Sequence, residues 1–145
     1  MLLEHECWAL LRSTEVGWLA VCVWEAPDIF PLNYVMDHGT VVFRTAEGSK
    51  LSAIVAVSLV AFEVDGYDEQ AHEAWSVVIK GSAQEIKRLH ERIQSSDLPL
   101  FPWHVAPKGH FVRIEPQTIS GRRFHVVDPS AWHTPTIGTR PTSEE

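Results

Sequence analysis

Runs of β-branched and aromatic residues alternate with closely spaced turn residues along most of this chain, and this alternation restricts the possible folds most strongly. Strands are predicted over residues 16–24, 29–36, 40–45, 60–64, 75–83, 110–114 and 120–127. Turns are predicted at residues 26–28 and 37–39, and the strand over residues 60–64 is predicted to end at Asp65 and Gly66. Short strands at such spacing, with few helices, indicate a mainly β fold built as an antiparallel barrel.

Short helices are predicted to flank these strands, over residues 5–13, 50–57 and 84–94. Residues 95–109 contain three prolines and are predicted to be irregular, and residues 67–73 to form a loop. The segment after Asp128 is rich in Pro, Thr and Ser, which is typical of a loose tail. We therefore expect one domain over residues 1–127 and a C-terminal tail over residues 128–145.

Charge and composition exclude several classes of protein. The 145 residues carry a formal net charge of −7, which argues against nucleic-acid binding. No apolar run approaches the roughly 18–20 residues of a membrane helix, and the acidic start lacks the features of a signal peptide, so we expect a cytoplasmic protein with no membrane contact. Cys7 and Cys22 make no disulfide framework, and the eight histidines form no recognisable metal set.

The residues from Arg44 to Lys50 carry the clearest signal for a ligand. An apolar strand ends in Arg44 and Thr45, and Ser49 and Lys50 follow at a predicted helix start. Helix N-terminal amides attract anions, and an arginine offers a planar fork for a phosphate. The spacing fits a phosphate site and, equally, two surface cations beside a plain helix cap. The order of residues is not that of a P-loop.

Three other segments are candidates for binding a ring system. Pro31 leaves unpaired backbone groups in its strand and therefore predicts a strand edge or a bulge. These groups and the Asn33 amide are able to hydrogen-bond to the edge of a planar ring, but an ordinary barrel edge without a ligand explains the proline better. Trp75 and Ser76 are placed to line the mouth of a pocket. Alternatively, Trp75 packs in the core and Ser76 is a capping residue. Residues 102–104 and 121–124 bring a tryptophan and two arginines, of which at most one faces any given site. The acidic run over residues 63–69 is more typical of a solvated loop than of paired carboxylates.

Taken together, these motifs resemble a known family. The resemblance extends over roughly residues 4–125 and is carried by residues 6–8, 16–20, 31–34, 43–51, 62–65, 75–78 and 121–123. It is to the pyridoxamine 5′-phosphate oxidase-like flavoproteins, nearest to the actinobacterial type grouped with nitroimidazole-resistance proteins. The element Arg-Thr-x-x-Gly-Ser-Lys is its most specific part. The resemblance implies a split β-barrel homodimer with two FMN sites at the subunit interface.

The resemblance also implies roles for individual residues. The phosphate would be held by Arg44, Thr45, Ser49 and Lys50, and the isoalloxazine edge would meet the backbone of Pro31, Leu32, Asn33 and Tyr34. Trp75 and Ser76 would approach the ribityl chain or the ring, and the second protomer would supply Trp103 and either Arg122 or Arg123. Two positions depart from the family pattern, because Trp18 and Lys108 stand where relatives usually carry arginine.

The activity implied is that of an FMN-dependent oxidoreductase acting on a small molecule other than pyridoxamine phosphate. One alternative is a deazaflavin-dependent reductase, although the acidic tail of deazaflavin suits a chain of negative charge less well. Another is a protein that stores or sequesters a flavin or haem without turnover. A flavin carries the redox chemistry itself, so none of these requires a catalytic acid or base from the protein.

Overall fold

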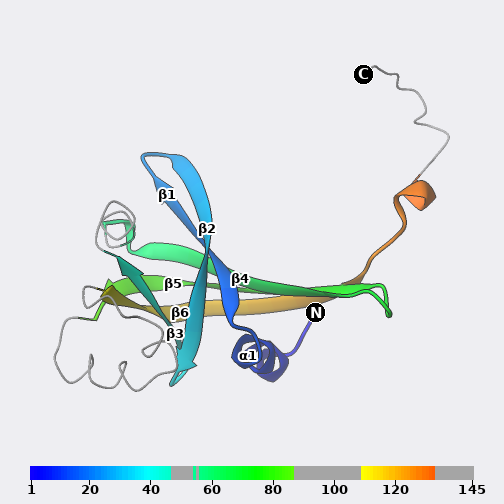
Figure 1. Cartoon of the computed structure of the whole chain (residues 1–145), viewed down its shortest axis with the longest axis horizontal. Helices are drawn as coiled ribbons and strands as arrows, with labels where there is room; N and C mark the ends of the chain where they lie inside the picture. Colours follow the sequence, from blue (N-terminus) through cyan, green and yellow to red (C-terminus); the bar gives the residue numbers. More distant parts are fainter. Residues whose placement is uncertain (47–53, 55, 87–108, 133–145) are drawn as a thin grey trace, which may run out of the picture.

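The computed structural model describes residues 1–46, 54, 56–86 and 109–132, and the strands of this part form a closed antiparallel barrel (Figure 1). The ring runs in the order β1-β2-β3-β6-β5-β4, which confirms the prediction of a mainly β, antiparallel barrel. The elements are α1 (Glu4–Arg12), β1 (Val16–Val23), β2 (Ala26–Asp37), β3 (Thr40–Ala46), β4 (Leu59–Asp68), β5 (Glu73–Glu85), β6 (Gly109–His125) and a 3-10 turn (Pro129–Trp132).

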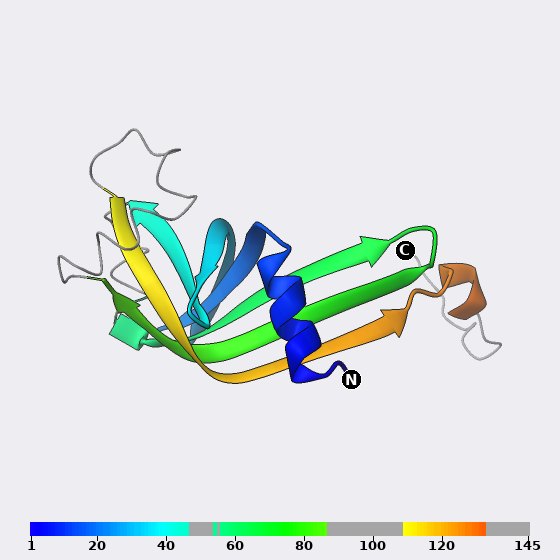
Figure 2. The same cartoon turned by 90° about the horizontal axis from the view of Figure 1, so that it is seen from below.

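The predicted N-terminal helix is present as α1 and packs against the sheet. Its start is stabilised by the carboxylate of Glu6, which accepts a hydrogen bond from the Leu3 amide at 2.8 Å. The amide of Leu2 donates to the carbonyl of Gly121 at 3.0 Å. A Cβ at Gly121 would lie 2.7 Å from the Cys7 sulfur, so the glycine allows the helix to approach β6 closely. Figure 2 shows α1 lying across β5 and β6.

The barrel interior is apolar and well packed. Tyr34 is buried there and donates its hydroxyl to the carbonyl of Leu11 at 2.5 Å, which links β2 to the end of α1. Its ring meets Phe62 edge-on at 4.9 Å between centroids. Burial raises the pKa of Tyr34 to about 12, so the hydroxyl remains a donor at neutral pH. The largest fully buried side chains are Phe43, Phe62, Leu11, Leu19, Ile54, Ile79 and Ile114.

The prediction of two separate strands over residues 110–114 and 120–127 is wrong, because β6 continues through both. The ladder between β5 and β6 shifts register at Lys80 and Gly81, where Gly81 faces Pro116. A Cβ at Gly81 would lie 2.1 Å from the carbonyl oxygen of Glu115. The bulge therefore depends on glycine at position 81, and it accommodates a proline that would otherwise end the strand.

One predicted turn and one predicted strand end are also wrong. Residues 26–28 belong to β2, and the chain reverses just before them at Trp24 and Glu25, which both adopt positive φ (54° and 64°). Hairpin turns of this kind usually contain Asn or Gly, so the sequence carried no signal for it. Residues 65–66 lie inside β4, where Gly66 leaves room for the indole of Trp75 rather than ending the strand. The turn predicted at residues 37–39 is confirmed, with His38 and Gly39 at positive φ.

Some predicted elements fall partly outside the described residues. Ile54, Ala56 and Val57 are helical, in agreement with the helix predicted over residues 50–57, whose first half lies outside. The helix predicted over residues 84–94 is wrong at its start, since Gln84 and Glu85 end β5, and its remainder beyond Ile86 lies outside. The predicted loop over residues 67–73 is shorter than expected, because β4 and β5 extend into it.

We predict that Tyr34→Phe lowers the free energy of unfolding by about 1–2 kcal/mol, because it removes the bond to Leu11 and leaves a buried carbonyl unpaired. Urea denaturation measures the change. Tyr67→Phe is the matched control, since Tyr67 is exposed and makes no recorded hydrogen bond within the described residues, and it should change stability by less than about 0.5 kcal/mol. Equal stability of the two variants would contradict the proposed role of the hydroxyl.

Candidate functional site

β2 and β3 separate from each other part-way along their length. Their ladder extends from the Asp37–Thr40 pair to the Tyr34–Phe43 pair. Residues 31–33 of β2 pair with β1, and the described residues give them no ladder partner on the side of β3. Pro31 lies in this stretch, as a strand proline predicts. The backbone of residues 31–33 thus faces the end of β3 across a gap between the strands.

The side chains of residues 31–34 alternate between the two faces of β2. Leu32 packs against the core and Tyr34 is buried in it, whereas Pro31 and Asn33 are exposed. Asn33 donates its side-chain amide to the carbonyl of Glu15 at 3.5 Å. A ligand beside this stretch would meet the backbone edge, Pro31 and Asn33, whereas the side chain of Tyr34 serves the core.

Arg44 and Thr45 lie near the end of β3, opposite the gap from Asn33. The guanidinium carbon of Arg44 lies 5.9 Å from the centroid of the Phe111 ring, across the β3–β6 ladder. Thr45 pairs with His110, whose Nδ1 lies 2.6 Å from the carboxylate of Glu85. Neighbouring residues on a strand point to opposite faces, so one bound group can meet both side chains only at the strand end. Ser49, Lys50 and Trp103 lie outside the described residues and stay predictions.

Trp75, Ser76 and Arg122 lie together at the other end of the sheet. Ser76 pairs with Arg122 on β6 and with Asp65 on β4. The indole of Trp75 points to the opposite face, where it packs over Gly66 and against the core. Arg123 also points to that face, within 3.9 Å of the Glu73 carboxylate. The structure therefore groups Ser76 with Arg122 and separates both from the Trp75 side chain.

These two groups of predicted site residues are far apart in a single chain. Arg44 pairs with Phe111, and Arg122 follows eleven residues further along the same strand. At the rise of a β-strand this corresponds to about 35 Å along β6. Figure 2 shows β6 running from one end of the molecule to the other. Within one chain, the structure brings Arg44 and Thr45 near residues 31–34, but not near Trp75, Ser76 or Arg122.

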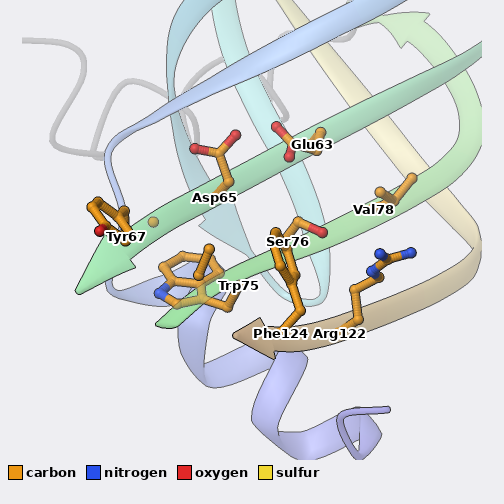
Figure 3. Close-up of a pocket in the computed structure, with 10 residues that line it drawn as sticks. Glu63, Asp65, Tyr67, Trp75, Ser76, Val78, Arg122 and Phe124 are labelled. Atoms are coloured by element: carbon orange, nitrogen blue, oxygen red, sulfur yellow. The ribbon is translucent and has the colours of Figure 1, made fainter. Parts of the chain in front are cut away.

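A hollow of about 570 Å³ lies on the outer face of β4, β5 and β6 (Figure 3). Phe62 and Val64 point into the core, so the residues between and after them point outward into the hollow. β5 forms the floor between the other two strands. The principal lining side chains are Glu63, Asp65 and Tyr67 on β4, Ser76 and Val78 on β5, and Arg122 and Phe124 on β6.

Glu63 and Asp65 form a close carboxyl pair in this hollow. Burial, followed by the hydrogen bond and like charge of Asp65, raises the pKa of Glu63 to about 7. Trp18 lies directly across the β1–β4 ladder from Glu63, so both side chains stand on the same face of the sheet. The interpretation of residues 63–69 as a solvated loop is therefore wrong for the first part of that run. The alternation of Phe62 and Val64 with two acids was the signal that sequence reasoning missed.

A second polar cluster joins β2, β3 and β6 at the turn after β2. Arg113 donates to Asp37 at 2.9 Å and to the hydroxyl of Thr40 at 2.7 Å, and the His38 ring lies 2.7 Å from Asp37. Burial opposes ionisation of Asp37, but the hydrogen bonds from Arg113 and His38 lower its pKa overall. Arg113 and Asp37 are paired with each other at this turn, so the cluster stabilises the hairpin of β2 and β3.

The described residues contain no group of three or more histidine, cysteine or acidic side chains placed to hold a metal ion. None of the helices in this part of the chain has both the length and the apolar character needed to cross a membrane. The candidate site comprises the β2–β3 gap, the end of β3 and the outer-face hollow.

The family model described as pyridoxamine 5′-phosphate oxidase matches residues 4–123. The chain belongs to this family. An uncharacterized protein of Mycobacterium tuberculosis is 44% identical over 85 residues, which cover 59% of this chain and 76% of that protein. A structure described as the FAD binding protein from Mycobacterium smegmatis is 38% identical, with a TM-score of 0.78, covering 87% of this chain and 98% of the other. The family and its split-barrel fold, expected from the motifs, are confirmed.

Two solved structures of lower sequence identity share the fold alone. One is described as a putative 5-nitroimidazole antibiotic resistance protein from Bacteroides thetaiotaomicron, at 11% identity and a TM-score of 0.71, covering 85% of each chain. Another is described as a heme binding protein from Mycobacterium smegmatis, at 12% identity and a TM-score of 0.67, covering 83% of this chain and 56% of that one. The same barrel thus occurs in proteins named for different ligands.

We predict that Trp18→Arg lowers the pKa of Glu63, because a guanidinium replaces the ring directly across from the carboxyl. Titration of the Glu63 side-chain carboxyl by ¹³C NMR measures the shift. Trp24→Arg is the matched control, since Trp24 lies exposed at the hairpin turn and should leave the pKa unchanged. An equal effect of both substitutions, or none of either, would contradict the placement of Trp18 beside Glu63.

Proposed function

We propose that this protein binds FMN between two copies of the chain and uses it in an oxidoreductase reaction on a small molecule. The observation that carries the proposal is the gap between β2 and β3. There, a backbone edge with Pro31 and Asn33 lies opposite the strand end that carries Arg44 and Thr45. A hydrogen-bonding edge for a ring and a cationic strand end for a phosphate are the two features a flavin mononucleotide needs. The 38% identical relative named for FAD binding supports a flavin.

Arg44 and Thr45, with Ser49 and Lys50 that follow, are proposed to hold the phosphate. The planar fork of an arginine binds two phosphate oxygens at once, and hydroxyl groups complete the coordination. A chain of net charge −7 repels anions at long range, so such a site has to be built locally from a few cations and hydroxyls. The carboxylate of Glu85 is already engaged with His110 at this end, which limits its repulsion of a bound phosphate.

A homodimer is proposed because the predicted flavin residues lie in two groups. The separation of about 35 Å along β6 exceeds what one flavin mononucleotide can bridge. If both groups touch the same flavin, Trp75, Ser76 and Arg122 come from a second copy of the chain, together with Trp103. Each dimer then contains two equivalent sites, as an isologous arrangement requires.

The flavin, when bound, supplies the redox chemistry, and the residues of this chain bind and orient it. The backbone of residues 31–33 offers hydrogen bonds along one side of the ring, and Asn33 adds an amide. The substrate is proposed to be a small molecule other than pyridoxamine phosphate. Steady-state turnover of the flavin-loaded protein with a nicotinamide donor and candidate acceptors tests the enzymatic part. A bound flavin without turnover would indicate storage instead.

We predict that Arg44→Ala combined with Lys50→Ala weakens FMN binding by more than about 2 kcal/mol, roughly 30-fold, because charge-assisted hydrogen bonds to the phosphate are lost. Quenching of flavin fluorescence on titration measures the affinity. Arg12→Ala removes a positive charge at the end of α1, away from β3, and should leave the affinity nearly unchanged. Unchanged affinity in the double variant would refute the phosphate site.

The identity of the cofactor has a direct test as well. The absorption spectrum of the purified protein, followed by mass spectrometry of the released chromophore, distinguishes FMN from FAD, deazaflavin and haem. Competition between FMN and deazaflavin in the titration ranks the two flavins. FMN as the preferred ligand is the expected result, and a protein that binds no flavin would overturn the proposal.

A further inference from the structure

The outer face around the hollow presents a regular grid of side chains from three paired strands. One row contains Tyr67, Ala74 and Phe124, and the next contains Asp65, Ser76 and Arg122. A third row begins with Glu63, which Trp18 borders from β1. Tyr67, Phe124 and Trp18 are each at least 40% exposed, so aromatic surface surrounds the charged row. An apolar patch of this kind on a sheet face indicates a surface that another molecule covers.

The charges on this face are segregated by strand. Both acids lie on β4 and the arginine lies on β6, and the β5 residues of these rows, Ala74, Ser76 and Val78, are neutral. Asp65 and Arg122 occupy the same row, so their backbones are about 10 Å apart. No ion pair joins Arg122 to either acid within the described chain, and its guanidinium carbon lies 5.4 Å from the centroid of the Phe124 ring. The face therefore holds an acidic side and a basic side that do not neutralise each other.

Rotation by 180° about an axis that runs along β5, above the sheet, exchanges these two sides. It places β6 of one copy over β4 of the other, and the row of Asp65 and Arg122 over itself. Two sheets pack face to face about 10 Å apart, a separation that an arginine side chain and an aspartate span together. An axis across the strands would instead set the acids of one copy against the acids of the other. Of these two rotations, the one about the axis along β5 makes the face self-complementary in charge.

We propose that this face is the contact between two copies of the chain, in which Arg122 of each copy enters the hollow of its partner and pairs with Glu63 and Asp65. The proposal rests on the homodimer of the proposed function and names its contact surface. Each ion pair occurs twice, as in any isologous dimer. Tyr67 and Phe124 cover the charged row on one side and Trp18 on the other, which excludes water from it. Arginine has five N–H donors, so Arg122 keeps donors for a flavin at the edge of the same contact.

The first test mixes two charge-reversed variants, Asp65→Arg and Arg122→Asp. Each variant alone opposes like charges at both contacts, and we expect its dimer dissociation constant to rise at least tenfold. Mixed in equal amounts, the two should form a heterodimer, because one contact then has a reversed pair and the other a native pair. Analytical ultracentrifugation measures the dissociation constants, and native mass spectrometry identifies the heterodimer by its mass.

A matched control uses Arg123→Asp, which reverses the neighbouring arginine on the opposite face of β6. It should dimerise like the unaltered chain and form no preferential heterodimer with Asp65→Arg. A monomeric unaltered chain, or dimers insensitive to both reversals, would overturn the proposal. So would a mixture that stays monomeric, since the charges would then act within one chain.

The second test is the pH dependence of dimerisation. Glu63 carries a proton up to about pH 7 in the single chain, and an approaching guanidinium favours its ionised form. The charged groups that face it are Asp65 on its own strand, Lys80 on β5, and Arg122 on β6. Dimerisation then releases protons below pH 7, so the dissociation constant should be about tenfold higher at pH 6 than at pH 8.

Glu63→Gln should abolish most of this difference, and Glu69→Gln, outside the grid, should not. A dissociation constant that does not change between pH 6 and pH 8, or that falls on acidification, would overturn the assignment of Glu63 to the contact. Flavin titration of the same samples keeps the two proposals apart. A dimer that binds no flavin refutes the proposed function alone, and a flavin-binding chain whose dimers ignore both charge reversals refutes this inference alone.

Discussion

The ladder between β5 and β6, with its bulge at Gly81, sets the positions of both groups of candidate site residues. It joins the end of β6 that lies beside Arg44 to the end that carries Arg122. The bulge also reverses the side-chain alternation. Before the bulge, the side chains of Val112 and Ile114 point into the barrel. After it, the inward position is that of Gly121, where a Cβ would meet α1. Arg122 therefore points outward, and a glycine without a Cβ decides which of two adjacent arginines faces the hollow.

The two ends of β6 therefore serve different parts of the candidate site. One end pairs with the end of β3 that borders the gap between β2 and β3, and the other end contributes to the outer face. The long extension of β4, β5 and β6 holds aromatic and charged side chains in register because every row is tied by the ladders. Burial of Glu63 in this extension, together with the hydrogen bond and like charge of Asp65, raises the pKa of its carboxyl to about 7, so its charge changes near neutral pH.

Much of the fold could be predicted from the sequence because local chemistry agreed with the tertiary structure. The β-branched run of β1, the helix that starts near Glu4 and the turn at Gly39 all follow propensity and pattern. The wrong predictions lie where tertiary contacts override local propensity. Gly66 is a strand residue because the Trp75 indole needs its space, and Pro116 does not end β6 because Gly81 lies opposite. Neither partner can be recognised from sequence spacing alone.

The family, the mainly β architecture and the cationic element that begins at Arg44 were predictable from the sequence, since they depend on residue types and short-range order. Only the folded chain shows that Tyr34 serves the core, that Glu63 and Asp65 form a pair, and that Arg44 and Arg122 lie at opposite ends of one strand. These facts depend on strand register and on one bulge. A shift of a single residue moves a side chain to the other face of a sheet, and long-range pairing sets that register.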